Sequence, residues 1–426
     1  MKMTNVGIIG FGTVGSGTAR ILLQQGELIK KRTGIDIKLK KIADIDIKRD
    51  RGINIPPGVL TTDAYEIIND PEIDVVVELV GGFKPAKTFI LDAIKQGKHV
   101  VTANKALLAQ EGHEIFAEAL KHNKTVGFEA AVAGGIPIIK VLREGLAANN
   151  ISAIYGIING TSNYILTKMT REGISFEDAL KEAQALGYAE ANPSFDIEGI
   201  DTAHKLTLLS CLAYGIELSY DKVYKEGITA ITPLDIQFAT ELGYKIKLLA
   251  ITKNIDGEVE LRVHPTMIPQ DYLISQVDDV LNAVYVIGDA VGETMYYGRG
   301  AGDMPTGSAV VSDIIDIAKG YSHTLGQDNS SSLKIKDIRD VYSMYYFRFT
   351  ALDKPGVLSK ISGVLGDHDI SISAVIQKER RAGEAIPLVV LTHKARERDV
   401  LDAVAKIDIL PVVADTTKFI RVEGKE

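Results

Sequence analysis

A glycine-rich turn near the N-terminus constrains the fold more than any other segment of this 426-residue chain. The turn directly follows an apolar run and consists of Gly10, Phe11, Gly12, Thr13, Val14 and Gly15. Gly10 permits a tight turn, Gly12 lets the backbone approach a ligand closely, and Gly15 allows a helix to pack against the strand. Free N–H groups at a helix start favour an anion. Strand, turn and helix in this order predict a dinucleotide site, and a purely structural glycine turn is the alternative.

Short apolar runs alternate with longer helical patterns as far as about residue 128. We expect strands at residues 6–9, 38–43, 75–79, 100–102 and 126–128. Such alternation predicts an α/β domain in which a parallel sheet carries helices on both faces, of the Rossmann type. A later helix, residues 306–319, has an apolar face that can pack back on this sheet. The dinucleotide-binding domain is therefore expected to comprise residues 1–137 and 303–325.

The centre of the chain mixes strand and helix patterns without regular alternation. Examples are residues 154–158, 176–186, 202–213 and 258–263. We expect residues 138–302 to form an α+β domain that binds substrate, carries the catalytic groups and forms a dimer contact.

The C-terminal part is predicted to be an independent unit. The polar cluster at residues 328–332 lacks periodicity and marks a linker, which we place at residues 326–341. From residue 342 to 426 the elements follow the order βαββαβ, with a hairpin around Ala382 and Gly383. That order is the ferredoxin-like arrangement.

Composition favours small molecules as binding partners. A net charge of −8 and a pI near 5.6 argue against nucleic acid or an anionic membrane surface. No apolar run approaches the ~18 residues of a membrane span, and the N-terminus lacks the pattern of a secretory signal. Cys211, the single cysteine, lies in an apolar helix and is interpreted as a structural thiol. We expect a soluble, cytoplasmic protein.

Two sets of side chains compete to decide which nucleotide binds. Asp44 ends the second expected strand, where a carboxylate accepts the ribose hydroxyls of NAD and repels a 2′-phosphate. Lys48, Arg49 and Arg51 follow closely and can bind that phosphate instead. We favour NAD or the use of both NAD and NADP. A second glycine-rich turn, ending at Gly302, is either a further point of cofactor contact or a simple interdomain turn.

Charged residues gather at the head of an apolar helix. Asp201 and Lys205 lie four residues apart on one face of its first turn, so their side chains can meet. An exposed ion pair is the simplest interpretation. A buried pair would need a partner or a task, because uncompensated burial of charge is expensive. Lys105 follows a strand at the ligand-binding edge of the expected sheet, or else is a surface lysine that opens the next helix.

Taken together, these motifs resemble those of homoserine dehydrogenases. The matching segments keep the family's order over the first ~320 residues: 10–15, 100–105, 129–137, 159–166, 187–205 and 298–302. The C-terminal unit, through residues 353–358 and 370–372, resembles an ACT domain, which members of this family often carry as an amino-acid sensor. No aspartate-kinase segment precedes these motifs, so we expect the single-activity form.

The resemblance implies reversible reduction of L-aspartate 4-semialdehyde to L-homoserine by a reduced nicotinamide, in threonine, methionine and isoleucine biosynthesis. An ammonium group can stabilise the charge that grows on the aldehyde oxygen and can donate a proton. By resemblance, Lys205 is the expected proton donor and Asp201 orients it. Glu190 and Asp196 are expected to bind the substrate. Lys105 is expected to line the cofactor site and either to pair with the substrate carboxylate or to share proton transfer.

Three further assignments also follow from the resemblance. Thr161 either hydrogen-bonds the substrate or caps a helix. A monovalent-cation site, with sodium as the expected ion held by carbonyls and one carboxylate, is matched by Glu129, Val132, Gly134 and Ile136. An effector site, with threonine as the natural ligand, is matched by Asp353, Gly356 and Ile370. Many ACT domains only dimerise, and paired ACT units lead us to expect a homodimer or homotetramer.

Two rival functions are considered. One is another amino-acid or aldehyde dehydrogenase on the same nucleotide domain, against which the 187–205 segment argues. The other is a non-catalytic amino-acid sensor, which would be free to lose carboxylates and lysines that are present here. His204 adjoins Lys205, but neighbouring side chains on a helix point about 100° apart, so His204 is interpreted as structural.

Overall fold

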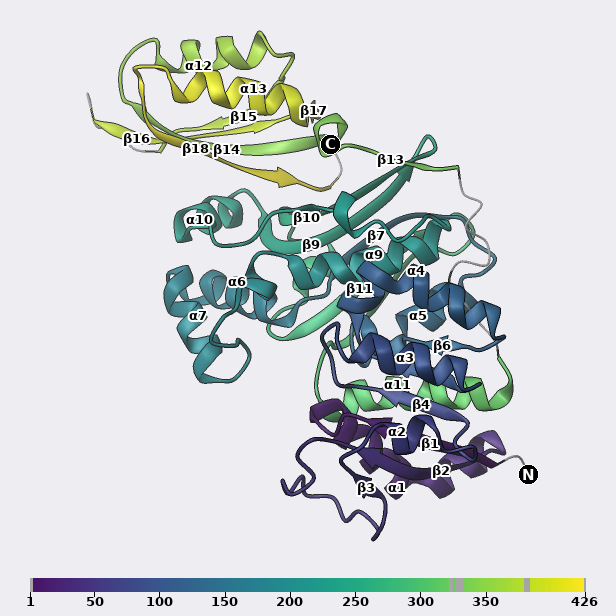
Figure 1. Cartoon of the computed structure of the whole chain (residues 1–426). Helices are drawn as coiled ribbons and strands as arrows, with labels where there is room; N and C mark the ends of the chain where they lie inside the picture. Colours follow the sequence, from purple (N-terminus) through teal and green to yellow (C-terminus); the bar gives the residue numbers. More distant parts are fainter. Residues whose placement is uncertain (1–2, 322–324, 326–331, 379–383, 425–426) are drawn as a thin grey trace.

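The computed structural model describes residues 3–321, 325, 332–378 and 384–424. Three parts follow one another along the length of the molecule (Figure 1). The N-terminal sheet lies at one end, a mixed sheet with its helices occupies the centre, and the C-terminal unit lies at the other end. Within the described residues, no helix is both long enough and apolar enough to cross a membrane.

The N-terminal sheet is parallel and six-stranded. Its order is β3-β2-β1-β4-β5-β6. The strands are β1 (Met3–Ile9), β2 (Asp36–Ala43), β3 (Leu60–Thr61), β4 (Val75–Glu78), β5 (His99–Thr102) and β6 (Val126–Gly127). All five expected strands are confirmed, whereas β3 is too short to produce a pattern. The strand order reverses between β1 and β4, which is where open α/β sheets bind ligands.

Helices cover both faces of this sheet. They are α1 (Thr13–Thr33), α2 (Tyr65–Ile68), α3 (Ala86–Lys95), α4 (Lys105–Lys121) and α11 (Asp303–Lys319). The last of these returns from far along the chain to pack on α1. A Cβ on Gly17 would lie only 2.0 Å from the carbonyl oxygen of Asp303, so the close approach requires glycine. The predicted return of residues 306–319 to the first sheet is thereby confirmed.

The centre is built on a long mixed sheet. Its strands are β7 (Ile151–Ile157), β8 (Tyr224–Lys225), β9 (Tyr244–Ile255), β10 (Glu258–Pro269), β11 (Leu281–Gly288), β12 (Gly292–Arg299) and β13 (Lys334–Ile335). Its helices are α5 (Ile138–Lys140), α6 (Gly160–Glu172), α7 (Phe176–Ala185), α8 (Ser194–Ile197), α9 (Ile200–Tyr214) and α10 (Pro233–Glu241). Short 3-10 and π turns complete it: η1 (Glu129–Ala131), η2 (Val141–Gly145), η3 (Tyr220–Lys222), η4 (Leu273–Gln276) and η5 (Ile338–Asp340).

The C-terminal unit has the predicted βαββαβ order. Its elements are β14 (Tyr342–Leu352), α12 (Val357–Gly366), β15 (Ile372–Ile376), β16 (Ala385–Thr392), β17 (Ala395–Arg396), α13 (Glu397–Asp408) and β18 (Val413–Val422). The expected turn at Ala382 and Gly383 lies outside the described residues. The four main strands pair in the order β18-β14-β16-β15.

This unit is less independent than its sequence predicts. Strand β18 pairs with β10 in parallel, through Thr266 with Arg421 and Met267 with Val422, so one twelve-stranded sheet runs through both parts. Strand β13 lies inside the expected linker and also pairs with β10, while residues 326–331 of that linker lie outside the described residues. Pairing between strands so distant in sequence leaves no local pattern, because the sequence of a strand does not specify which other strand it pairs with.

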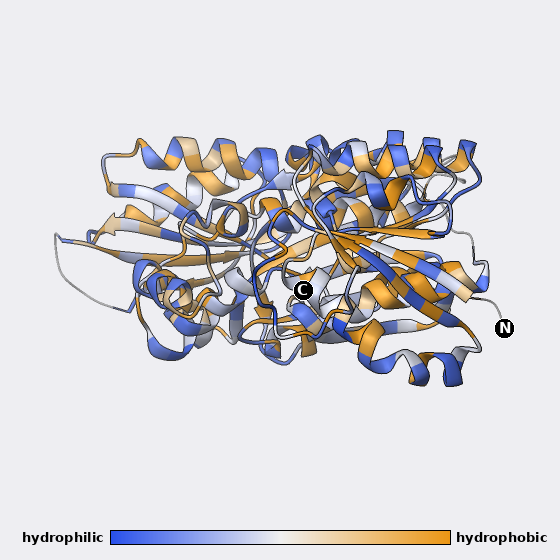
Figure 2. Ribbon diagram, turned by 60° about the horizontal axis from the view of Figure 1, so that its bottom comes forward, coloured by the Kyte–Doolittle hydropathy of each residue, from blue (hydrophilic) through white to orange (hydrophobic). Residues whose placement is uncertain are grey.

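Apolar residues occupy the strands and the inward faces of the helices. Figure 2 shows these runs in orange, with hydrophilic residues in blue along the outer faces of the helices. Helix α9 differs from the others because it is buried over nearly its whole length, including its charged first turn. Charges enter the interior of the protein there.

Candidate functional site

The glycine-rich turn has the geometry that its sequence predicts. Gly10 has φ 102°, and a Cβ there would lie 2.6 Å from the backbone of Leu79. A Cβ on Gly15 would lie 2.1 Å from the carbonyl oxygen of Gly10, so helix and strand meet closely. At Gly12, which precedes the first turn of α1, a Cβ would meet nothing within 4 Å. The backbone at Gly12 is therefore open to a ligand, next to the free N–H groups of a helix start.

Asp44 is already engaged beside this turn. Its carboxylate accepts hydrogen bonds from the N–H groups of Phe11 at 2.6 Å and Asp46 at 2.8 Å. It also pairs with Arg51 at 3.4 Å, and the Arg51 guanidinium lies 4.6 Å from the centre of the Phe11 ring. Lys48 is exposed. Of the competing basic residues, Arg51 is thus the one that meets Asp44.

The charged turn of α9 forms a buried cluster. Lys205 Nζ donates to Asp201 Oδ2 at 2.7 Å and to the carbonyl oxygen of Ile158 at 2.6 Å. Lys205 is only 8% exposed and Asp201 only 4%. The simplest interpretation of the sequence, an exposed ion pair, is wrong, because the apolar helix carries its first turn into the body of the protein.

A second lysine reaches the same carboxylate from the first sheet. Lys105 opens α4 just after β5, and its Nζ lies 3.2 Å from Asp201 Oδ1. Asn104 caps the helix by accepting the N–H of Leu107. Lys105 therefore starts a helix and also faces the cluster. Asp201 lies between two ammonium groups that come from different helices, α4 and α9.

Burial and neighbouring charge shift the proton affinities in this cluster. Burial alone would raise the pKa of Asp201, but the charges of Lys205 and Lys105 outweigh it and hold this pKa below its usual range. Burial lowers the pKa of Lys205 from its ordinary 10.5; the charge of Lys105 lowers it further and that of Asp201 opposes the change. Lys205 consequently releases a proton more readily than an exposed lysine.

Asn159 links two of the expected site carboxylates, and sequence reasoning missed it. Its amide nitrogen donates to Asp196 Oδ1 at 2.7 Å and to Asp201 Oδ2 at 2.9 Å. Its side-chain oxygen accepts the N–H of Ser162, which caps α6. Burial raises the pKa of Asp196. The available signal was an asparagine directly ahead of a helix within the 159–166 motif.

Two other expected substrate ligands lie apart from the cluster. Thr161 is not the helix cap; its hydroxyl donates to the carbonyl oxygen of Tyr188 at 2.7 Å and ties down the acidic loop. Glu190 is exposed on that loop, where its backbone carbonyl accepts a hydrogen bond from Gln184. The structure thus brings together Lys205, Lys105, Asp201 and Asp196 but not Glu190.

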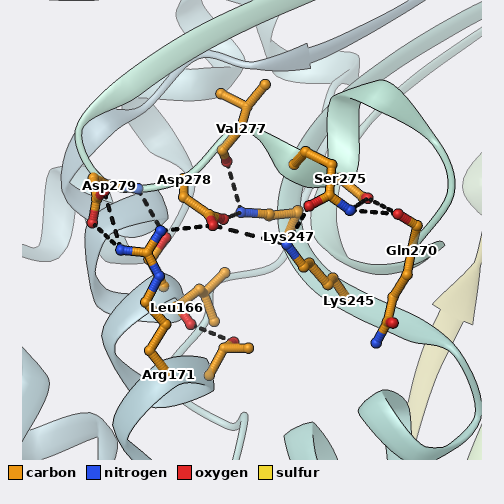
Figure 3. Close-up of polar contacts among 12 residues, drawn as sticks. Leu166, Arg171, Lys245, Lys247, Gln270, Ser275, Val277, Asp278 and Asp279 are labelled. Carbon is orange, nitrogen blue, oxygen red and sulfur yellow. Dashed lines mark hydrogen bonds and ion pairs between the residues drawn. The ribbon is translucent and has the colours of Figure 1, made fainter.

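A second buried lysine supports the helix that carries Asn159. Figure 3 shows Lys247 of β9 donating to Asp278 and to the carbonyl of Val277, with Arg171 of α6 paired to Asp278 and Asp279. The Lys247 ammonium also donates to Asn163 Oδ1 at 3.1 Å. These contacts hold α6, near its start at Asn163 and at its end at Arg171, against the loop before β11.

His204 is packed among aromatic rings. It stacks on Tyr220 with ring centres 4.2 Å apart and on Phe195 at 5.5 Å. Its Nε2 lies 2.8 Å from the Gln110 side chain. Burial lowers its pKa to about 4, so the ring is neutral at physiological pH. This environment agrees with the structural interpretation of His204.

At the expected cation site, the Glu129 carboxylate is already hydrogen-bonded to the backbone. Both of its carboxylate oxygens accept backbone N–H groups at 2.8 Å, from Ile139 and Lys140. This carboxylate thus caps α5, and each of its oxygens keeps one further lone pair beside the backbone carbonyls of Val132, Gly134 and Ile136. Among the described residues, no group of three or more His, Cys, Asp or Glu side chains is arranged to hold a metal.

The second glycine-rich turn packs against this same loop. A Cβ on Gly134 would lie 2.4 Å from the backbone of Gly300. Gly302, with φ 122°, precedes the first turn of α11. The turn therefore joins the central part to the first sheet.

The C-terminal unit has a cavity of about 240 Å³ that Asp353 and Gly356 help to line. Gly356 precedes α12 with φ 85°. Asp353 Oδ2 is buried and has no hydrogen-bond partner in the described part of the chain. Ile370 instead lies in the apolar core of the unit, so the structure brings only two of the three expected effector residues to the cavity.

Comparison with known families covers most of the chain. The model "Homoserine dehydrogenase, NAD binding domain" matches residues 10–129, "Homoserine dehydrogenase" matches residues 137–315, and "ACT domain" matches residues 345–410. The first of these confirms a nicotinamide-nucleotide domain, and the last confirms the ACT domain predicted from sequence.

Similar proteins extend over the full length. The homoserine dehydrogenases of Neisseria gonorrhoeae and Pseudomonas aeruginosa are 48% and 47% identical, and the alignments cover 99–100% of this chain and 99% of each relative. The crystal structure of a homoserine dehydrogenase from Thiobacillus denitrificans superposes with a TM-score of 0.94 at 48% identity, covering 99% of both chains. A hyperthermophilic archaeal homoserine dehydrogenase in complex with NADPH covers 76% of this chain and 99% of its own, with a TM-score of 0.64 at 30% identity. The chain belongs to the homoserine dehydrogenase family.

Proposed function

We propose that the buried cluster around Asp201 is the site at which this chain interconverts L-homoserine and L-aspartate 4-semialdehyde. The observation that supports this proposal most strongly is that two lysines share the carboxylate of Asp201, which lies 2.7 Å from Lys205 and 3.2 Å from Lys105. Lys105 follows β5 at the carboxyl edge of the nucleotide-binding sheet. Open α/β sheets bind their ligands at this edge, so a bound nucleotide would extend towards the cluster. An ammonium there suits a reaction that places negative charge on a substrate oxygen.

Lys205 is the proposed proton donor and acceptor. The nicotinamide, when bound, supplies or accepts the hydride. In reduction, the Lys205 ammonium stabilises the charge growing on the aldehyde oxygen and donates a proton to it. In oxidation, Lys205 in its neutral form accepts the hydroxyl proton of homoserine, and its lowered pKa increases the share of lysine in that neutral form. Asp201 and the Ile158 carbonyl orient the amine, and together they accept two of its three N–H donors.

The substrate's charged ends have separate partners in this proposal. Asp196 accepts the α-ammonium, with Asn159 holding the carboxylate in place. Lys105, whose side chain is one-third exposed, pairs with the α-carboxylate and borders the nicotinamide. Glu190 is proposed as a second ligand for the ammonium. Thr161 is assigned to holding the acidic loop through Tyr188.

The proposed cofactor preference is NAD, or both NAD and NADP. In this proposal Asp44 accepts the ribose hydroxyls and Arg51, its ion-pair partner, meets a 2′-phosphate. The residue that favours NAD and the residue that favours NADP therefore contact each other. The archaeal relative solved with NADPH supports the use of the phosphorylated cofactor within this fold. Gly302, at the start of α11, is proposed to lie beside the bound nucleotide.

A sodium ion is proposed to bind the loop between Glu129 and Ile136. Backbone carbonyls are suitable ligands for a hard ion of low charge. Positive φ angles at Ala133 and Gly134 turn successive peptides there, as is common where carbonyls converge on an ion. A higher rate in sodium chloride than in choline chloride of equal ionic strength would support this site, and equal rates would exclude it.

Regulation and assembly complete the proposal. Threonine is proposed to bind the cavity beside Asp353 and Gly356, where a helix start can hold its carboxylate.

A homodimer or homotetramer is proposed through the open face of the long sheet, where Tyr155, Tyr285 and Met295 border a cavity of about 530 Å³. Sedimentation velocity measures the assembly directly.

The activity is tested by comparing oxidation of homoserine with oxidation of a panel of other hydroxy and amino acids. Each substrate is assayed with NAD and with NADP. Turnover of homoserine at least ~100-fold above the panel is expected. Faster turnover of another substrate would favour a different dehydrogenase, and binding of homoserine without turnover would favour a non-catalytic sensor.

A further inference from the structure

Residues 224–228, which begin with strand β8, contact the turn that holds the site carboxylates. The N–H of Ile228 donates to the carbonyl oxygen of Ile197 at 2.8 Å. A Cβ on Gly227 would lie 2.4 Å from that same oxygen, so the two backbones are in direct contact. Ile197 immediately follows Asp196, and Asp201 begins four residues later. The position of this segment therefore fixes the turn between α8 and α9.

The neighbouring part of the same segment is held by the ACT domain. Arg421 of β18 donates to Glu226 Oε2 at 2.7 Å and to the hydroxyl of Tyr224 at 3.0 Å. Tyr224 in turn donates to Glu226 at 2.9 Å. Arg421 is 1% exposed, whereas the Glu226 side chain is 35% exposed, so the pair is anchored from the buried arginine.

Arg421 is held rigidly from its own side. Its Nε donates to Glu397 Oε2 at 2.9 Å, and Nη2 bonds the other oxygen of that carboxylate. The hydroxyl of Tyr345 donates to Glu397 as well, at 2.6 Å. A bidentate arginine–carboxylate pair of this kind has a defined geometry. The ACT domain thus presents a fixed guanidinium to Glu226.

Side chains give a second connection from the same segment to the site. Lys225 lies 4.4 Å from the centre of the Tyr220 ring, and Tyr220 stacks on His204. His204 stacks on Phe195, over which Lys105 lies at 5.8 Å. Backbone and side-chain contacts thus both run from β8 to the cluster.

We propose that Glu226, held by Arg421, is a positioning residue for the substrate-binding turn at residues 196–201, through which the ACT domain sets the affinity for the amino-acid substrate. This inference rests on the proposed role of Asp196 in binding the substrate. The expected effect is on KM rather than on kcat. Lys205 is also held by the carbonyl oxygen of Ile158, which is not part of this connection, and Asp201 at the end of the turn is held independently by Lys105 and Asn159.

The chain offers a matched control. Arg348 of β14 pairs with Asp235 of α10 at 2.6 Å, and Tyr346 also bonds this carboxylate. This is another ion pair between the ACT domain and the central part, more deeply buried than that of Arg421 with Glu226, and its helix α10 packs on β9 and α6. Loosening the ACT domain as a whole would affect both pairs alike, whereas a specific connection distinguishes them.

The test is steady-state homoserine oxidation by the full chain carrying Glu226→Gln, which preserves shape and removes charge. KM for homoserine is expected to rise about 3- to 10-fold, while kcat and the KM for the nicotinamide change less than about 2-fold. Tyr224→Phe, a milder break in the same network, is expected to raise KM for homoserine by a smaller factor. Asp235→Asn is expected to lower Tm without changing this KM. An unchanged KM in both network variants, or an equal rise in Asp235→Asn, would overturn the proposal.

Asp196→Asn separates this inference from the proposed function. If Asp196 binds the substrate, its replacement raises KM for homoserine, and its effect combines non-additively with that of Glu226→Gln. An unchanged KM in Asp196→Asn would refute the role of Asp196. A raised KM in Asp196→Asn with an unchanged KM in Glu226→Gln would refute only the connection to the ACT domain.

Discussion

Two buried lysines in the central part of the molecule resemble each other closely, yet only one belongs to the proposed site. Lys205 and Lys247 each form an ion pair of 2.7 Å with an aspartate, Asp201 and Asp278 respectively. Burial lowers the pKa of both lysines. Neither burial, nor pairing, nor a shifted pKa separates them.

The number of hydrogen bonds that each ammonium donates distinguishes Lys205 from Lys247. The Lys247 ammonium donates to Asn163, Val277 and Asp278, which accounts for its three N–H donors. In the described part of the chain, Lys205 has two acceptors, so one donor remains for a ligand. Lys105 adds a second positive charge beside it. A saturated lysine holds structure together, and an unsaturated one next to another cation is suited to proton transfer.

The strongest test of this difference is Lys205→Ala. We expect kcat to fall at least ~100-fold, with cofactor affinity and Tm little changed, because the group that protonates the substrate oxygen is lost. Kinetics of homoserine oxidation and thermal unfolding measure both quantities. Lys247→Ala is the matched control and should do the reverse, lowering Tm while kcat stays within about 3-fold. Near-normal turnover by Lys205→Ala would remove the distinction.

A smaller effect is expected from the aspartates. The negative charge of Asp201 raises the pKa of Lys205, so Asp201→Asn should lower that pKa further. Homoserine oxidation requires neutral Lys205. The rising limb of the pH profile of kcat should therefore move to lower pH by about one unit. Asp278→Asn, at the saturated lysine, should leave the pH profile of kcat in place. A limb that does not move in Asp201→Asn would assign the titration to another group.

An aspartate–arginine pair at the nucleotide turn extends the comparison to cofactor choice. In Asp44→Ser, Arg51 loses its partner and becomes available to a 2′-phosphate. We expect the ratio of kcat/KM for NADP to that for NAD to rise about 5-fold, equivalent to about 1 kcal/mol. Asp46→Ser changes an exposed neighbouring carboxylate and serves as the control. An unchanged ratio in Asp44→Ser would mean that the basic residues alone decide the preference.

Local patterns in the sequence predicted much of this molecule. The glycines at 10, 12 and 15, the alternating strands and the βαββαβ order all follow from residues close together in the chain. The charged cluster was only partly predictable. Spacing on one helix brings Asp201 and Lys205 together, whereas Lys105 and Asn159 meet them through tertiary packing that no periodicity encodes.

The failures have the same physical origin. Asn159 was missed because its role depends on two carboxylates that lie 37 and 42 residues further along the chain. The contacts of the Glu129 carboxylate with two N–H donors at the start of α5 were also not foreseen from the sequence, because they join residues ten and eleven positions apart through a turn. The continuous sheet through β10 and β18 was unforeseen because strand pairing at this separation leaves no local trace.

Incomplete hydrogen bonding also marks the ACT domain, where it leads to the smallest expected effect. Asp353 has one buried carboxylate oxygen without a partner in the described part of the chain, whereas Asp340, just before the ACT domain, is paired to Arg396 and Arg398 of that domain. If a buried polar group with an unused hydrogen-bonding atom marks a ligand site, as argued for Lys205, then Asp353 is the carboxylate that binds an amino-acid ammonium. Asp353→Asn should then raise the threonine concentration for half-maximal inhibition about 3-fold, and Asp340→Asn should leave it unchanged. Titration of threonine into full-length native and variant chains measures this. Equal sensitivity of the native chain and Asp353→Asn would show that an unpartnered polar atom in this cavity does not mark a ligand site, and would confine the rule to the lysine cluster.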